Sequence, residues 1–190
     1  MMKYKQAIFT LLVTLMFCVA VMPAQSASVS MGGRTLTLLG ATLEVGKPLP
    51  EISLPDSGMN MTALQSLKGR VAILSVVPSI DTKVCEKQTH ILSEENEGLD
   101  AQLLTISRDL PFAQKRFAKE AKIANLTFLS DYRDGSFGQA TGLLIEESRL
   151  LTRAVIVVDK EGIIRHLEIV PDLRQLPDMK KAFQVARKLN

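Results

Sequence analysis

The sequence predicts an α/β domain organised around a mixed β-sheet, and two observations lead to this prediction. Apolar runs of strand length alternate along the chain with longer segments that have helical spacing. Near the C-terminus, two apolar runs flank a turn at residues 160–162, and a last helical segment follows them. Alternating strands and helices favour parallel pairing, whereas a hairpin adds an antiparallel strand. We therefore expect helices to flank a central sheet that contains both kinds of pairing.

The elements of the first half follow from apolar runs and turn residues. Three prolines within residues 46–55 exclude a helix there, because proline removes a helical hydrogen bond. Thr62 is a residue type that caps helices, and Gly69 is one that ends them. The expected elements are a hairpin over residues 29–43 with its turn at Met31-Gly32-Gly33, an extended connector over 46–55, a short helix over 62–67, a buried strand over 71–77 and a mostly polar helix that begins near Cys85.

Similar signals define the second half. Pro111 suits the first turn of a helix, and Asp109 just before it is a capping residue type. Met179, Phe183 and Ala186 recur at the spacing of one helical face. The expected elements are strands over residues 101–107, 126–129, 153–159 and 163–170, a helix over 111–123 and a terminal helix over 176–189.

The N-terminus has the three parts of a secretory signal peptide. Lys3 and Lys5 supply the positive region, and residues 7–21 are apolar except for two threonines. Ala24 and Ser26 place small residues at positions −3 and −1 of a cleavage site, so we expect cleavage before Ala27. An uncleaved N-terminal anchor is the alternative, although the apolar run is short for a membrane span.

These signals divide the chain into a signal peptide, residues 1–26, and one domain, residues 27–190. A lipoprotein anchor through Cys18 is disfavoured, because the large side chain of Phe17 precedes it. We expect an exported protein, periplasmic by location, with no stable membrane association once the leader is removed. Export through such a leader implies an oxidising compartment.

The composition is that of a globular protein, with 46% hydrophobic and 23% charged residues in 190. The formal net charge is +3, and removal of the two leader lysines leaves +1. A charge this small, with no Trp in the chain, argues against a surface that binds nucleic acid.

The chain has two cysteines, and one of them, Cys18, would leave with the signal peptide. The mature domain would then have Cys85 alone and could form no internal disulfide. In an exported protein a leftover single cysteine indicates a reactive thiol or an intermolecular pairing. The common alternative is a buried cysteine that packs as a small hydrophobe.

The surroundings of Cys85 favour the reactive alternative. Pro78 ends a buried apolar run, and Cys85 follows seven residues later, near the start of a helix. Backbone N–H groups in a first helical turn lack helical partners and favour an anion such as a thiolate. The stretch P-S-I-D-T-K-V-C matches the P-x-x-x-T-x-x-C pattern of peroxiredoxins. Thr82 stands where a C-x-x-C motif would have its first cysteine, so dithiol exchange is excluded at this loop.

Further segments make the resemblance specific. S-R-D-L-P-F-A-Q-K-R-F at residues 107–117 resembles the S-x-D-L-P-F-A-Q-x-R-F segment of the bacterial thiol peroxidases, a peroxiredoxin subfamily. Residues 130–142 are similar to the next loop of that subfamily, and T-R-A-V at 152–155 resembles its strand with the active-site arginine. The likeness covers residues 29–190.

The resemblance implies a thioredoxin-like fold and the reduction of hydroperoxides without a metal or an organic cofactor. Cys85 would be the peroxidatic cysteine, which becomes a sulfenic acid. Thr82 would hydrogen-bond the thiolate and the peroxide. Arg153 would stabilise the thiolate and the charge on the leaving oxygen, and Pro78 would shield the sulfur from water. Family members commonly pair as homodimers, so we expect the same here.

One position departs from the subfamily pattern. Thiol peroxidases typically have a resolving cysteine directly after the R-F of the second motif, and Ala118 stands there in this chain. We expect a one-cysteine mechanism in which an external thiol attacks the Cys85 sulfenic acid. That thiol could belong to a small molecule, to a thioredoxin-like exported protein or to a second subunit.

Other polar residues have simpler explanations. His90 and His166 do not have the spacing of metal ligands, and we expect both at the surface. We expect one solvated helical face at Lys115, Arg116, Lys119 and Lys122. Two functional alternatives to a peroxidase remain, namely a peroxide-reactive redox sensor and a binding module on a thioredoxin-like scaffold.

Overall fold

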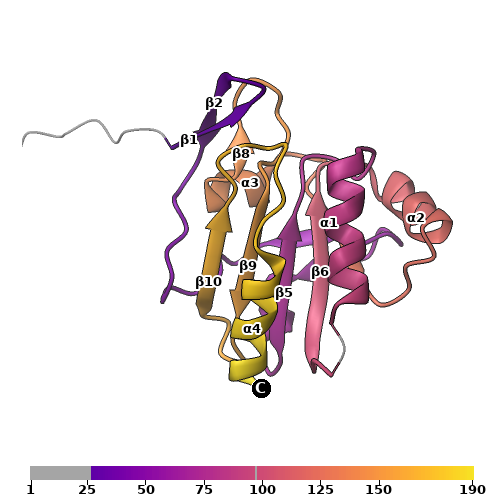
Figure 1. Cartoon of the computed structure of the whole chain (residues 1–190). Helices are drawn as coiled ribbons and strands as arrows, with labels where there is room; N and C mark the ends of the chain where they lie inside the picture. Colours follow the sequence, from indigo (N-terminus) through magenta and orange to yellow (C-terminus); the bar gives the residue numbers. More distant parts are fainter. Residues whose placement is uncertain (1–26, 97) are drawn as a thin grey trace, which may run out of the picture.

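The computed structural model describes residues 27–96 and 98–190, and a five-stranded sheet forms its centre (Figure 1). The strand order is β10-β9-β5-β6-β7. β5 pairs in parallel with β6, as does β6 with β7, whereas β9 pairs antiparallel with both β5 and β10. The mixed sheet is therefore confirmed. Its strands are β5 (Val71–Val76), β6 (Ala101–Ser107), β7 (Thr127–Ser130), β9 (Ala154–Val158) and β10 (Ile164–Ile169).

β5 is buried on both faces, which explains why its sequence is apolar except for Ser75. Val71 and Ile73 pack into a cluster with residues of α1 (Lys83–Glu94) and α4 (Met179–Leu189). Leu74 belongs to the larger cluster on the opposite face. Figure 1 shows α1 and α4 together on one side of the sheet. The central strand is thus enclosed between two apolar layers.

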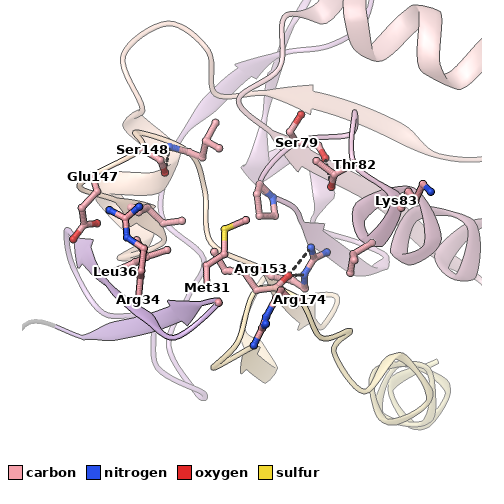
Figure 2. A pocket seen from close by; sticks show the side chains of 16 residues that line it. Met31, Arg34, Leu36, Ser79, Thr82, Lys83, Glu147, Ser148, Arg153 and Arg174 are labelled. Carbon is pink, nitrogen blue, oxygen red and sulfur yellow. Dashed lines mark hydrogen bonds between the residues drawn. The ribbon is translucent and has the colours of Figure 1, made fainter.

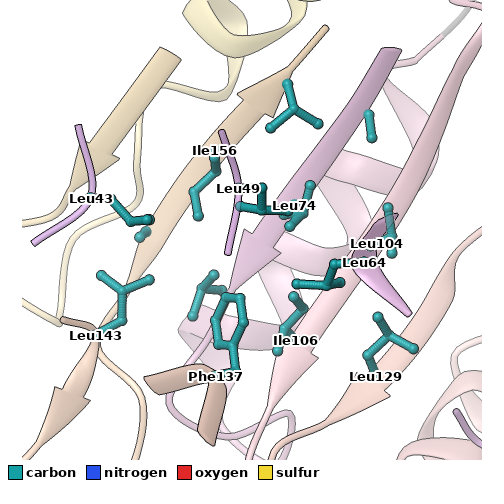
Figure 3. Packing of buried hydrophobic residues seen from close by; sticks show 14 of the residues in the cluster. Leu43, Leu49, Leu64, Leu74, Leu104, Ile106, Leu129, Phe137, Leu143 and Ile156 are labelled. Atoms are coloured by element: carbon teal, nitrogen blue, oxygen red, sulfur yellow. The ribbon is translucent and has the colours of Figure 1, made fainter. Parts of the chain in front are cut away.

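The opposite face is covered by the connector after the N-terminal hairpin and by α3 (Ser136–Thr141). Leu49 from the connector and Leu64 from the 3-10 helix that follows it meet Phe137 of α3 and Ile156 of β9 in the same buried cluster (Figure 3). This 3-10 helix is η1, at Leu64–Leu67. The connector and η1 therefore cover this face of the sheet without forming a long helix.

The N-terminal hairpin is confirmed. β1 (Ser28–Met31) pairs antiparallel with β2 (Arg34–Leu39), and β2 continues onto β8 (Leu144–Ile145). Gly32 and Gly33 form the turn with positive φ angles of 62° and 83°, a conformation that suits glycine. This three-stranded sheet lies at the end of the central sheet where the loop after β5 begins.

Two capping predictions were wrong. Thr62 lies inside β4 (Met61–Ala63), which pairs with β3 (Ser53–Pro55), and η1 has no side-chain cap. α2 (Pro111–Glu120) is preceded by Leu110 in the capping position, and the carboxylate of Asp109 points elsewhere. A capping residue type near a helix start does not settle which backbone groups its side chain reaches.

α3 and β8 were not predicted from the sequence. α3 has only six residues, so no helical period is visible. Its first turn is held by Asp131, whose carboxylate accepts the backbone N–H groups of Phe137 and Gly138 at 3.0 Å each. Burial raises the pKa of Asp131, although both hydrogen bonds act in the opposite direction. The element therefore depends on one partly desolvated carboxyl rather than on a sequence period.

The expected signal peptide, residues 1–26, lies outside the described residues. Within residues 27–96 and 98–190, no helix combines the length and the apolar character that crossing a bilayer requires.

Replacement of a core methionine tests the layer formed by α4. Met179 is 4% exposed and packs against the sheet, whereas Met61 is 54% exposed. We expect Met179→Ala to lower the free energy of unfolding by about 2–5 kcal/mol, because it removes buried apolar contacts and leaves a cavity. Met61→Ala is the matched control and should change it by less than about 0.5 kcal/mol. Equal effects in urea unfolding would contradict the assigned packing.

Candidate active site

The loop after β5 and the first turn of α1 place Cys85. Thr82 is extended and occupies the capping position, and its carbonyl accepts the N–H of Glu86 at 2.9 Å to begin the helix. Cys85 is the third residue of α1 and is 0% exposed. The prediction that the cysteine lies in the first helical turn is confirmed. Its sulfur is therefore close to unpaired helical N–H groups and shielded from water.

A buried guanidinium contacts this sulfur. Arg153 is 2% exposed, and its Nη2 donates to Cys85 Sγ at 3.4 Å. The same side chain donates from Nε and Nη2 to the carbonyl of Leu173, at 3.1 and 3.0 Å. A buried charge is tolerated when hydrogen bonds replace its lost hydration. A positive charge at this distance favours the thiolate form of cysteine.

Gln88 completes the set of partners around Arg153, and sequence reasoning missed it. Its Oε1 accepts from Arg153 Nη1 at 2.7 Å, and its Nε2 donates to Ser75 Oγ at 2.8 Å. Gln88 is fully buried and lies three residues after Cys85, on the same face of α1. That spacing was visible in the sequence, but a glutamine in a polar helix gives no sign of being buried.

A pocket of about 670 Å³ opens in front of Arg153 (Figure 2). It lies between the N-terminal hairpin, the loop after β5, the start of α1 and the segments around residues 145–150 and 173–174. Pro78, Thr82 and Arg153 line it, so three of the four residues implied by the resemblance meet at one cavity. Cys85 lies behind this wall, in contact with Arg153.

The hydroxyl of Thr82 does not point at the sulfur in this structure. It donates to the carbonyl of Ser79 at 3.4 Å. Among the described residues, Arg153 is the side chain that hydrogen-bonds Cys85 Sγ. The role that the resemblance implies for Thr82 would require its hydroxyl to rotate toward the sulfur or the peroxide.

Positive groups outnumber negative ones around the pocket. Arg34, Lys83 and Arg174 line it together with Arg153, and Glu147 is the acidic residue among its lining. Arg174 hydrogen-bonds Asp172 and thereby lowers the pKa of that carboxyl to about 2. The Asp172–Arg174 pair is consequently ionised at any pH near neutral. Because Asp172 offsets Arg174, the remaining excess of positive charge at the pocket comes from Arg34, Lys83 and Arg153 against Glu147.

Ala118 of α2 packs against the apolar cluster that contains Cys85. Val77, Ile80 and Phe128 are further members of that cluster. Within residues 27–96 and 98–190, Cys85 is the free cysteine, and no disulfide is formed there. The position that departs from the subfamily pattern therefore faces the neighbourhood of the cysteine.

The histidines lie apart from this site. His90 Nδ1 is 2.9 Å from Glu94 Oε1 on α1. His166 lies on β10 and is half-buried, and burial lowers its pKa. Both histidines are half-buried, so the prediction that they lie at the surface is met only in part for each, and α4 packs over the strand that carries His166. In the described part of the chain, no three Cys, His, Asp or Glu residues gather as metal ligands would.

The cationic residues of α2 fit their prediction. Lys115, Arg116 and Lys119 are exposed, as is Lys122 just after the helix. The prediction of a solvated face is confirmed.

The fold and the buried cysteine define the class of the protein. The redoxin family model matches residues 44–183. The crystal structure of a peroxiredoxin-like protein from Aquifex aeolicus superposes with a TM-score of 0.81 at 33% identity, covering 86% of this chain and 97% of that one. The predicted thioredoxin-like peroxiredoxin fold is thus confirmed.

Sequence relatives narrow the class further. A thiol peroxidase from Halalkalibacterium halodurans is 43% identical over 162 residues, which cover 85% of this chain and 98% of that protein. A thiol peroxidase from Bacillus subtilis is 40% identical over 164 residues, with 86% and 98% covered. The chain belongs to the thiol peroxidases of the redoxin family, which are peroxiredoxin-type oxidoreductases.

Removal of the buried charge tests the contact between Arg153 and Cys85. We expect Arg153→Met to slow alkylation of Cys85 by iodoacetamide about ten- to a hundredfold at neutral pH, because the thiolate loses its positive partner. The rate is followed by mass spectrometry on protein shown to be folded by circular dichroism. Arg70→Met is the matched control, since Arg70 pairs with Asp100 at the surface. An unchanged rate in Arg153→Met would show that the guanidinium does not activate the sulfur.

Proposed function

We propose that this protein is an exported one-cysteine thiol peroxidase that reduces hydrogen peroxide and organic hydroperoxides. The observation that carries the proposal is the contact between the buried sulfur of Cys85 and the buried guanidinium of Arg153. A helix start and a fixed cation on the same sulfur form the kind of environment that makes a cysteine nucleophilic. Membership of the thiol peroxidases supports the reaction class.

In the first step, the Cys85 thiolate attacks the terminal oxygen of the peroxide. A sulfur–oxygen bond forms, the oxygen–oxygen bond breaks, and the leaving oxygen departs as water or an alcohol after taking up a proton. Arg153 remains in place to stabilise the negative charge as it moves from sulfur to the leaving oxygen. Thr82 would donate to the peroxide, and Pro78 would exclude water from the sulfur. Cys85 is left as a sulfenic acid.

An external thiol then completes the cycle. Its sulfur attacks the sulfenic acid, water leaves, and a mixed disulfide forms on Cys85. A second thiol releases Cys85 as the thiol and carries away the disulfide product. Ala118 supports this route, because no cysteine stands at the position where the subfamily has its resolving residue. A small-molecule thiol, a thioredoxin-like exported protein or Cys85 of a second subunit could each serve, and we propose a homodimer.

The pocket supports the inclusion of organic hydroperoxides. Hydrogen peroxide would occupy only a small part of about 670 Å³. Leu36, Ile145 and Leu173 give much of the lining an apolar character, which would hold an alkyl chain beside Arg153. The same opening would admit a small thiol.

A redox sensor is the second candidate function, and the burial of Cys85 favours it. A sulfenic acid on a fully buried sulfur is protected from external thiols and would persist. The sensor would react with one equivalent of peroxide and then signal through a slow mixed disulfide. A binding scaffold would need neither the cysteine nor the arginine, so their contact argues against that third alternative.

Peroxide consumption by the mature chain separates these functions. We expect one equivalent of peroxide to be reduced without added thiol and many equivalents with it, because each turnover consumes two external thiols. Mass spectrometry should show a gain of one oxygen on Cys85 in the absence of thiol. Cys85→Ser is the control and should be inactive. One equivalent with every thiol tried would support the sensor, and no Cys85-dependent reaction would refute both.

A cysteine in place of Ala118 provides a positive control for the missing resolving thiol. Because Ala118 packs against the cluster that contains Cys85, we expect Ala118→Cys to form an intramolecular disulfide after one equivalent of peroxide. Nonreducing electrophoresis and thiol titration would detect it. Ser93→Cys, on the far end of α1, is a matched control that should leave the sulfenic acid unresolved.

Export is the remaining part of the proposal, and the leader composition supports it. When the full chain is produced in a Gram-negative host, we expect it in the periplasmic fraction with Ala27 as its first residue. Replacing both Lys3 and Lys5 with Glu should slow export, because the positive region is lost. Recovery of the intact chain from the membrane fraction would indicate the uncleaved anchor instead.

A further inference from the structure

The carboxylate of Asp109 hydrogen-bonds the loop that lies in front of Cys85. The hydroxyl of Ser79 donates to its Oδ1 at 2.7 Å, and the N–H of Ile80 donates to its Oδ2 at 2.8 Å. Hydrogen bonds to an ionised acceptor are stronger than those between neutral groups. One side chain, from the segment between β6 and α2, thus holds two consecutive residues of a loop about 30 positions earlier in the chain.

The backbone around Asp109 is held by hydrogen bonds to neighbouring segments. Its backbone carbonyl accepts the hydroxyl of Ser130 at the end of β7. The preceding residue, Arg108, uses its guanidinium to donate to three backbone carbonyls, those of Asp131, Tyr132 and Arg149. The backbone that carries the Asp109 carboxylate is therefore held by contacts outside the loop. The carboxylate acts as an anchor for residues 79–80 rather than as a mobile partner.

The anchored loop separates the pocket from the sulfur. Pro78, Ser79 and Thr82 line the pocket, and the Thr82 hydroxyl rests on the carbonyl of Ser79. Ile80 points inward and packs in the same apolar cluster as Cys85. A displacement of residues 79–80 would therefore move both the residues that line the pocket and the apolar cover of the sulfur.

We propose that Asp109 is a positioning residue for peroxide reduction by Cys85. It holds the loop at residues 78–82 in place, so that Pro78 and Thr82 stay at the wall of the pocket in front of the sulfur. This inference rests on the proposed function. Without the carboxylate, the Ser79 hydroxyl and the Ile80 N–H lose their partner, and the loop shifts toward solvent to hydrate them.

Two reactions of the same sulfur respond differently to such a shift. Attack on a peroxide requires the surrounding donors to be aligned, and a misplacement of about 1 Å can lower such a rate about a hundredfold. Alkylation by iodoacetamide requires a thiolate and access, and no aligned donors. Opening of the loop should therefore lower the peroxide rate while leaving the alkylation rate unchanged or raising it.

The experiment compares both rate constants in the full chain under single-turnover conditions. In Asp109→Ala, we expect the rate of sulfenic acid formation with hydrogen peroxide to fall about ten- to a hundredfold. The alkylation rate should be equal to or higher than that of the unmodified protein. Asp109→Asn can still accept the Ile80 N–H and can donate to Ser79 Oγ, so it should recover most of the peroxide rate. Ser79→Ala loses one of the two bonds and should fall between them.

Asp178→Ala is the matched control. Asp178 caps α4 by accepting the N–H of Lys181, away from the pocket, so its removal should lower the melting temperature without changing the ratio of the two rates. An unchanged ratio of the peroxide rate to the alkylation rate in Asp109→Ala would refute the positioning role. This includes the case in which both rates fall in parallel with stability. If Asp109→Ala does not fold, the ratio in Ser79→Ala decides in the same way. Failure of the unmodified protein to react with peroxide would refute the proposed function instead.

Discussion

The buried positive charge of Arg153 is the constraint on which the arrangement of this site depends. A guanidinium removed from water must have its donors satisfied, or it destabilises the fold by several kcal/mol. Here the carbonyl of Leu173, the amide of Gln88 and the sulfur of Cys85 accept its hydrogen bonds. These partners come from two separate parts of the chain, α1 and the segment around Leu173. Their positions are therefore fixed by one side chain, and the sulfur takes part in satisfying a charge that would otherwise be unstable.

The mixed topology of the sheet makes this contact possible. β9 runs antiparallel to β5, and Ala154 at the start of β9 lies opposite Val76 at the end of β5. Arg153 immediately precedes β9, so it is delivered to the place where β5 ends and the loop toward Cys85 begins. A parallel β9 would have put the arginine at the opposite end of the strands, where β5 begins. The antiparallel strand is consequently a requirement of the site as well as of the fold.

The sequence predicted those features that depend on local pattern. The positions of β5, β6 and β9 were predicted nearly to the residue, because strands covered on both faces are rich in apolar residues. Cys85 and Arg153 came from motifs that resemble a known family. Gln88 and Asp109 were missed or misassigned, because their partners lie 65 and about 30 positions away in the chain. Side chains that act across such separations leave no local signal, and neither does a helix as short as α3.

The burial of Cys85 has two opposing consequences for the loop that covers it. The role proposed for Arg153 would depend on a water-excluded site, in which a charge acts more strongly than it does in solvent. Reduction by a thiol from outside depends on the same sulfur becoming accessible, since no second cysteine is present near it in the described residues. In the proposed one-cysteine cycle, the residues that cover the sulfur, Pro78 through Thr82, would therefore have to open for the external thiol. The two hydrogen bonds that the Asp109 carboxylate accepts from Ser79 and Ile80 would keep such a loop ordered and would be few enough to break when it opens.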